Sequence, residues 1–347
     1  MRVSQYPFHA VRSNLEPLHV ERQASLQDRS PGLVDLKAGA EDGRHLGFPN
    51  ESPSTQAGGQ WALTTTLDAH ERSSVLQEVT KAVIPAAGLG TRLKPLTAHM
   101  PKELLPIGEK PMIQHTLEMY MASGISELCI ITSPQKGLIK DFVTGHWLPP
   151  ALPFSRDEVL YKNLERCRTV FLTQKEPKGV ADAISLARDF VGNEPFACIM
   201  PDCLLFSKKP MAKQLIRAFR RCKTNVMGTI FIRGEAIGCF GNVGVLETET
   251  ADDDCPAIIS LSDKKEEPLS GNPAAVIYKG FGGGIYLSEY FQLLEATRPH
   301  AKGEVDDVPI HQILARKGAL VGIPLEGVAF DAGHPLGYRA AARFAGR

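Results

Sequence analysis

The stretch AVIPAAGLGTRLKPLTAHMPKELLPIGEKPMIQ, from Ala82 to Gln114, decides the fold. It begins as an apolar run typical of a buried strand and passes directly into the glycine-containing segment Gly88–Arg92. It ends in a sequence with helical spacing, in which Ile113, Leu117 and Tyr120 share one face. A strand, a glycine loop and an amphipathic helix in that order predict the start of an α/β domain.

The same alternation continues along the chain. Apolar runs typical of strands are KAVIPAA, ELCIITS, TVFLTQ, FACIMPD, VMGTIFI and AIISLS, and VADAISLARDFVG is a second amphipathic stretch. We therefore expect a Rossmann-like, mainly parallel or mixed sheet that is flanked by helices. The later runs GNVGVLETE, KGFGGGIYLS and GALVGIPLEG have less helix between them, and they predict a mixed extension or lobe that closes over a second substrate.

The chain divides by composition into residues 1–79 and residues 80–347. The first part lacks apolar periodicity and is rich in Ser, Pro, Gly, Gln and charge, which predicts a low-complexity, disordered extension. A docking or regulatory arm and a misassigned translation start are alternatives. All the chemistry that we can identify lies in the second part.

Charge and composition exclude several classes of function. The 39 basic residues balance 39 acidic ones, so no net field favours nucleic acid or an anionic membrane. The sequence has no apolar stretch of membrane-spanning length and no apolar region of a secretory signal, which predicts a cytoplasmic protein. The seven cysteines are scattered without metal-binding spacing, and we expect buried, reduced thiols.

The glycine loop predicts a phosphate site. Glycines at the end of a strand let backbone N–H groups face a polyphosphate, and Arg92 adds a fixed cation there. The expected nucleotide-binding residues are Ala87, Gly88, Leu89, Gly90 and Thr91. The third glycine of the dinucleotide fingerprint is replaced by Leu93, and the loop lacks the lysine of a P-loop, so an NAD-dependent enzyme is disfavoured.

Two further residues fit phosphate chemistry. Lys102 lies between two prolines in Pro101–Pro106, which rigidify a segment that carries a second cation toward the loop. Asp202 follows the apolar strand of FACIMPD, where the carboxyl edge of an α/β sheet binds ligands, and its hard oxygens suit Mg²⁺.

The combination of GLGTR with PKELLP and KPMIQ resembles the bacterial glucose-1-phosphate uridylyltransferases, within the sugar-phosphate nucleotidylyltransferases. The resemblance covers roughly residues 80–343. It implies one nucleotidyl-transfer domain, dependence on Mg²⁺, and attack of a sugar-phosphate oxygen on the α-phosphorus of a nucleotide. The implied substrates are UTP and glucose 1-phosphate. Related enzymes are often dimers or tetramers, and a homo-oligomer is an expectation by analogy alone.

The resemblance also assigns residues. It carries uracil contacts onto Gln174 and Gly179, and it makes Asp331 the metal-binding partner of Asp202. This chain has Asp182 where the family has His or Gln, which places a negative charge near the nucleotide.

The sugar side is matched more loosely. The family's sugar-phosphate lysine corresponds to Lys264, with Lys265 as the alternative, and Asp263 takes the place of a glutamate that contacts sugar hydroxyls. Gly241 and Glu304 match further sugar-binding positions. With Arg92 and Lys102, Lys264 completes the expected catalytic set. The rival interpretations are the same reaction with dTTP or another hexose 1-phosphate, and a catalytically weakened nucleotide-sugar-binding paralogue.

Overall fold

The computed structural model describes residues 78–147, 157–241, 244–248, 255–263, 276–298 and 303–346. Nearly all of the expected extension over residues 1–79 lies outside these ranges, as do Lys264 and Lys265. Within the described part, no helix is long and apolar enough to cross a membrane.

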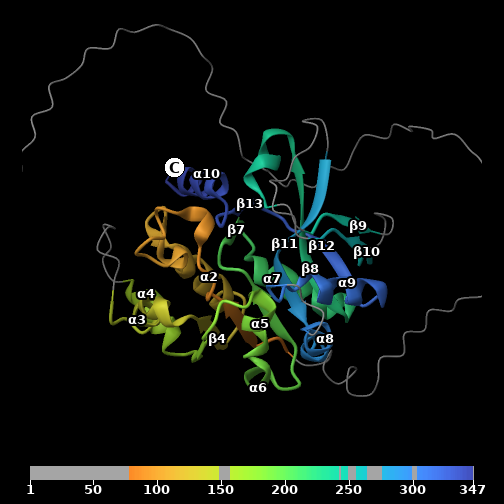
Figure 1. The fold of residues 1–347 in the computed structure, drawn as a ribbon, viewed down its shortest axis with the longest axis horizontal. Helices are drawn as coiled ribbons and strands as arrows, with labels where there is room; N and C mark the ends of the chain where they lie inside the picture. The colour runs from red at the N-terminus through yellow and green to blue at the C-terminus, as the bar shows by residue number, and fades with distance from the viewer. Residues whose placement is uncertain are drawn as a thin grey trace, which may run out of the picture. The chain divides into compact units, whose positions relative to one another are not determined.

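A seven-stranded sheet forms the centre of the described chain, in the order β12-β8-β11-β6-β1-β4-β5 (Figure 1). Its strands are β1 (Lys81–Pro85), β4 (Glu127–Thr132), β5 (Arg168–Thr173), β6 (Phe196–Ile199), β8 (Asn225–Arg233), β11 (Val276–Tyr286) and β12 (Leu320–Pro324). Only β11 runs antiparallel to its neighbours, β6 and β8. The expected mixed, mainly parallel sheet is confirmed.

Helices cover both faces of this sheet because the side chains of its inner strands alternate between two apolar cores. Ala82 and Ile84 of β1 join a core that includes Leu117 of α2 and Leu215 of α7, whereas Val83 faces the other core. The helices are α2 (Met112–Met121), α3 (Gly137–Val143), α4 (Glu158–Leu164), α5 (Val180–Ser185), α6 (Arg188–Val191), α7 (Met211–Cys222), α8 (Tyr290–Thr297), α9 (Val308–Arg316) and α10 (Pro335–Ala345). Helices α5, α8 and α9 contribute to the second core.

The two amphipathic stretches behave differently. Helix α2 begins after Pro111, and Ile113, Leu117 and Tyr120 are fully buried, as the spacing predicts. The stretch VADAISLARDFVG does not form one helix. It breaks between α5 and α6, where the amides of Leu186 and Ala187 bond to carbonyls only three residues back.

Three two-stranded sheets lie beside the central one. They pair β2 (Pro106–Ile107) with β3 (Lys110–Pro111), β7 (Cys203–Phe206) with β13 (Val328–Asp331), and β9 (Leu246–Thr248) with β10 (Ile258–Leu261). The run AIISLS was expected in the central sheet and instead forms β10, where Ile259 is exposed. KGFGGGIYLS and GALVGIPLEG, expected to form a mixed extension or lobe, extend the central sheet as the antiparallel β11 and as β12.

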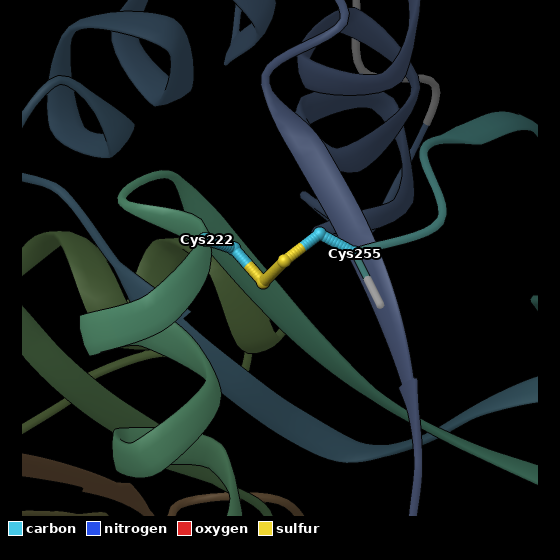
Figure 2. The surroundings of a disulfide bond; sticks show 2 residues. All are labelled: Cys222 and Cys255. Carbon is cyan, nitrogen blue, oxygen red and sulfur yellow. A yellow bond between two sulfur atoms is a disulfide. The ribbon is translucent and has the colours of Figure 1, made fainter. Parts of the chain in front are cut away.

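Two cysteines are bonded, contrary to the expectation of reduced thiols. Cys222 at the end of α7 forms a disulfide with Cys255, just before β10, with 5.8 Å between their Cα atoms (Figure 2). The two residues are 33 positions apart, which hides the pairing from any local spacing rule. The other five cysteines are free, and Cys129, Cys198 and Cys239 are buried as expected.

Candidate functional site

The glycine loop continues directly from β1 at the carboxyl edge of the sheet. The Ala86 amide extends the strand ladder to Ile131, and Gly90 then adopts a left-handed conformation at φ 67°. The Thr97 hydroxyl donates to the Gly90 carbonyl at 2.8 Å and fixes the turn. Gly88 and Leu89 remain exposed, so the loop presents its outer surface to an incoming ligand.

The pairing of β7 with β13 brings the two predicted carboxylates together. Asp331 lies opposite Cys203 in the ladder, and the Ala332 amide donates to the Asp202 carbonyl at 2.7 Å. Asp331 accepts from the amide of Gly241 at 2.9 Å and from the amide of Gly333 at 3.1 Å. Asp202, which immediately precedes β7, therefore lies beside Asp331 at the end of β13, although 129 positions separate them in the sequence (331 − 202).

Both predicted cations reach this pair of carboxylates. The Lys102 ammonium donates to Asp202 Oδ2 at 2.5 Å. A Cβ on Gly241 would lie 3.5 Å from Arg92 Nη1, and one on Gly333 would lie 3.3 Å from Arg92 Nη2, so the guanidinium lies beside both glycines. Arg92 and Lys102 thus meet Asp202 and Asp331 in one group, which we call the charge cluster.

The ion pair between Lys102 and Asp202 shifts both pKa values. Burial alone lowers the pKa of Lys102, but the charge of Asp202 outweighs it, so this pKa lies above its ordinary value. Burial raises the pKa of Asp202, but the charge and hydrogen bond of Lys102, together with the charge of Arg92, bring it below its ordinary value. Both side chains are therefore charged at neutral pH.

A buried ion pair supports the Lys102 segment. The Lys136 ammonium donates to Glu103 Oε2 at 2.7 Å and to the Ala86 carbonyl at 2.9 Å. Glu103 is fully buried, and its Oε1 has no hydrogen-bond partner among the described residues. Lys136 thereby ties the segment of Lys102 to the end of β1, and sequence reasoning did not identify it.

Lys279 on β11 is a second residue that sequence reasoning missed. It is 4% exposed, and its ammonium donates to the Gly241 carbonyl at 3.1 Å. Burial lowers the pKa of Lys279, while the nearby charge of Asp331 opposes that shift and Arg92 reinforces it. A lysine in the apolar, glycine-rich run VIYKGFGGG was the available signal.

The charge cluster fits a magnesium ion. Mg²⁺ commonly takes one or two protein carboxylates and completes its coordination with water and substrate phosphates. Gly333 allows the Asp202 carboxylate to lie against the backbone next to Asp331, because a Cβ at Gly333 would clash with Asp202 Oδ2. Within the described ranges, no three His, Cys, Asp or Glu side chains gather to hold a metal unaided, so phosphate oxygens would have to supply ligands.

The predicted base-reading residues lie at the carboxyl end of β5. Gln174 is 5% exposed, and its amide nitrogen donates to the Gly179 carbonyl at 3.0 Å. Gly179 precedes α5 with φ 108°, and a Cβ there would lie 2.5 Å from the Val305 carbonyl oxygen. Only glycine fits this position, because both the dihedral angle and the space exclude a side chain.

The predicted sugar-side residues are dispersed. Gly241 belongs to the charge cluster through its hydrogen bond to Asp331. Asp263 is exposed and accepts from Gln312 Nε2 at 2.8 Å. Glu304 adjoins Val305, whose amide donates to the Lys178 carbonyl at 2.6 Å, so its segment runs beside the base-reading residues. Lys264 lies outside the described residues.

The fold and the site define a class of protein. The family model described as "Nucleotidyl transferase" matches residues 81–305, and the chain belongs to that family. Its site brings a glycine loop, two cations and two carboxylates to one edge of the sheet.

The most informative relatives share a more specific name. The chain is similar to UTP--glucose-1-phosphate uridylyltransferases from Staphylococcus haemolyticus, at 30% identity over 76% of this chain and 91% of the relative, and from Bacillus subtilis, at 29% identity over 76% and 89%. A solved UDP-glucose pyrophosphorylase complexed with UDP-glucose aligns with a TM-score of 0.64 at 25% identity, covering 77% of this chain and 98% of that one.

Proposed function

We propose that this protein transfers a uridylyl group from UTP to glucose 1-phosphate and releases UDP-glucose and pyrophosphate. Membership of the nucleotidyl transferase family supports the reaction, and the names of the relatives support the substrates. The chemistry belongs to residues 80–347, which we propose as one nucleotidyl-transferase domain.

The observation that carries the proposal is the charge cluster beside the glycine loop. Arg92, Lys102, Asp202 and Asp331 come from four separate segments and meet at one point. A reaction between two phosphates requires this combination, because cations must neutralise the phosphates and carboxylates must hold a divalent ion. A protein that only bound a nucleotide sugar would have less need of all four groups.

The residues divide the work of the reaction. The glycine-loop amides and Arg92 bind the triphosphate, and Lys102 exchanges Asp202 for a phosphate oxygen as pyrophosphate departs. Asp202 and Asp331 would hold Mg²⁺, which when bound supplies charge neutralisation between the phosphates. The attacking phosphate oxygen already carries negative charge at neutral pH, so the step needs no general base.

Specificity comes from the edges of the site. Gln174 and Gly179 read the uracil, and Lys264 holds the sugar phosphate, with Lys265 as the alternative. Gly241, Asp263 and Glu304 bind the sugar. We propose that the protein is cytoplasmic. Disulfides are rare in the cytoplasm. Alkylation of free thiols in freshly lysed cells would show whether Cys222 and Cys255 are bonded there, and it would therefore test this placement.

The experiment is pyrophosphate release by the purified protein with Mg²⁺. UTP, dTTP, CTP and ATP are each combined with glucose, galactose and N-acetylglucosamine 1-phosphates. We expect the fastest turnover with UTP and glucose 1-phosphate. A preference for dTTP or another sugar would correct the substrates alone. Absence of turnover with every pair, together with binding of a nucleotide sugar, would replace the proposal with a non-catalytic paralogue.

A further inference from the structure

Both N–H donors of the Gln174 side-chain amide are used within the protein. Its nitrogen carries two hydrogens, and both go to protein oxygens: the Gly179 carbonyl at 3.0 Å and Asp182 Oδ2 at 2.8 Å. No hydrogen of this amide is left for a ligand. Among the described residues, no group donates to the amide oxygen, which therefore keeps its accepting capacity for a bound molecule.

The chemistry of the two partners fixes the orientation of the amide. A backbone carbonyl and an ionised carboxylate are acceptors only. If the amide turned by half a revolution, its oxygen would face both of these oxygens, and two hydrogen bonds would become two repulsions. The nitrogen therefore points to Asp182, and the oxygen points away from it.

Asp182 is itself held in place. Its Oδ1 accepts from Arg298 Nη2 at 3.1 Å, and the same guanidinium nitrogen donates to the Ser185 hydroxyl at 2.8 Å. The ion pair with Arg298 also offsets the negative charge that Asp182 brings near the nucleotide. One carboxylate oxygen thus orients Gln174 while the other is anchored to α8's C-terminal end.

We infer that Asp182 is a positioning residue that makes Gln174 an obligate hydrogen-bond acceptor toward the nucleobase. This inference rests on the proposed function, in which Gln174 reads the base. An acceptor matches the imide N–H of uracil or thymine. It opposes cytosine, whose ring nitrogen at the same position is an acceptor. Asp182 therefore selects for bases with an imide N–H without touching them.

The test is a double-mutant cycle on the preference for UTP over CTP. The ratio of the two kcat/KM values with glucose 1-phosphate is measured in wild type, Asp182→Ala, Gln174→Ala and the double variant. We expect Asp182→Ala to lower the ratio about tenfold, since a freed amide can turn to suit either base. In the Gln174→Ala background the same substitution should change nothing, because Asp182 acts only through Gln174.

Two controls separate positioning from a general effect. Asp182→Asn keeps an oxygen that can accept from Gln174, so the preference should remain within about threefold of wild type. Asp189→Ala removes an exposed carboxylate on α6 and should leave the preference unchanged. An unchanged ratio in Asp182→Ala, or an equal fall in the Gln174→Ala background, would overturn the inference.

A second measurement needs no variant. UTP methylated at N3 lacks the imide N–H, and wild type should use it at least about tenfold less well than UTP. Equal use of the two nucleotides would contradict an accepting Gln174. Failure of the proposed function is distinguishable, since it would remove wild-type turnover with UTP itself, and nucleotide binding by calorimetry would then supply the same ratios.

Discussion

The charge cluster and the base-reading edge around Gln174 both lie at the carboxyl edge of the central sheet, but we expect a ligand to affect their hydrogen bonds in opposite ways. In the charge cluster, Lys102 and Asp202 form an ion pair, which we expect to separate when phosphate and metal bind. At the proposed base-reading edge, Gln174 donates to Gly179 and Asp182, and we expect both hydrogen bonds to remain when a base binds. One region is built to exchange partners, and the other is built to stay fixed. We therefore propose that the charge cluster determines the rate of the reaction and that the base-reading edge determines which base is selected.

The largest effect is expected from Asp202→Ala. Removal of this carboxylate takes away a proposed metal ligand and leaves the Lys102 ammonium without its partner, so kcat should fall on the order of 1,000-fold. The free energy of unfolding should also fall, because a partly buried cation becomes unpaired. Adding Lys102→Met should restore stability and not activity. Recovery of activity in that double variant would contradict the roles of both residues.

Arg92→Ala should have the next largest effect. Loss of the guanidinium removes a positive charge that neutralises the departing pyrophosphate, and kcat should fall on the order of 100-fold. Arg92 is exposed, so the melting temperature should not change. Arg339→Ala on α10 removes an equally exposed arginine and serves as the control. Near-normal turnover in Arg92→Ala would remove this residue from the mechanism.

Lys279→Met tests whether the charge cluster extends to β11. Lys279 holds the Gly241 carbonyl, and the Gly241 amide holds Asp331, so the loss should displace Asp331 and lower kcat about tenfold. Stability should be maintained, because methionine fills the space without a buried charge. Initial rates and a thermal melt check both parts. A fall in stability with unchanged kcat would show that the lysine is structural.

Arg298→Ala should give the smallest effect, at the base-reading edge. The ion pair with Asp182 is partly exposed, and such pairs contribute little. The preference for UTP over CTP should decrease about threefold while kcat with UTP stays unchanged. A larger fall in kcat than in the preference for UTP would contradict the proposal that the base-reading edge affects selection and not rate.

The sequence predicted the parts of the site that depend on local order. The strand, glycine loop and helix between Ala82 and Gln114 could be read directly, since periodicity and glycine positions determine them. Asp202 could be named as a candidate because it follows an apolar run, and Asp331 because the family resemblance assigned it. Their meeting depends on the antiparallel pairing of β7 with β13, which no local pattern encodes.

The features that sequence reasoning missed all depend on distant contacts. Lys136 reaches Glu103 across 33 positions, and Cys222 pairs with Cys255 across the same interval. Asp182 was noticed only as a departure from the family. Its use became clear when the structure showed a hydrogen bond to Gln174 on one oxygen and an ion pair on the other.

The most direct test of the division between the two regions is the ratio of kcat/KM for UTP to that for CTP in Arg92→Ala and in Gln174→Ala. We expect Arg92→Ala to lower both kcat/KM values and to leave their ratio at its wild-type level. Gln174→Ala should bring the ratio close to one. A ratio that changes in Arg92→Ala, or that survives in Gln174→Ala, would contradict the assignment of rate to the charge cluster and selection to the base-reading edge.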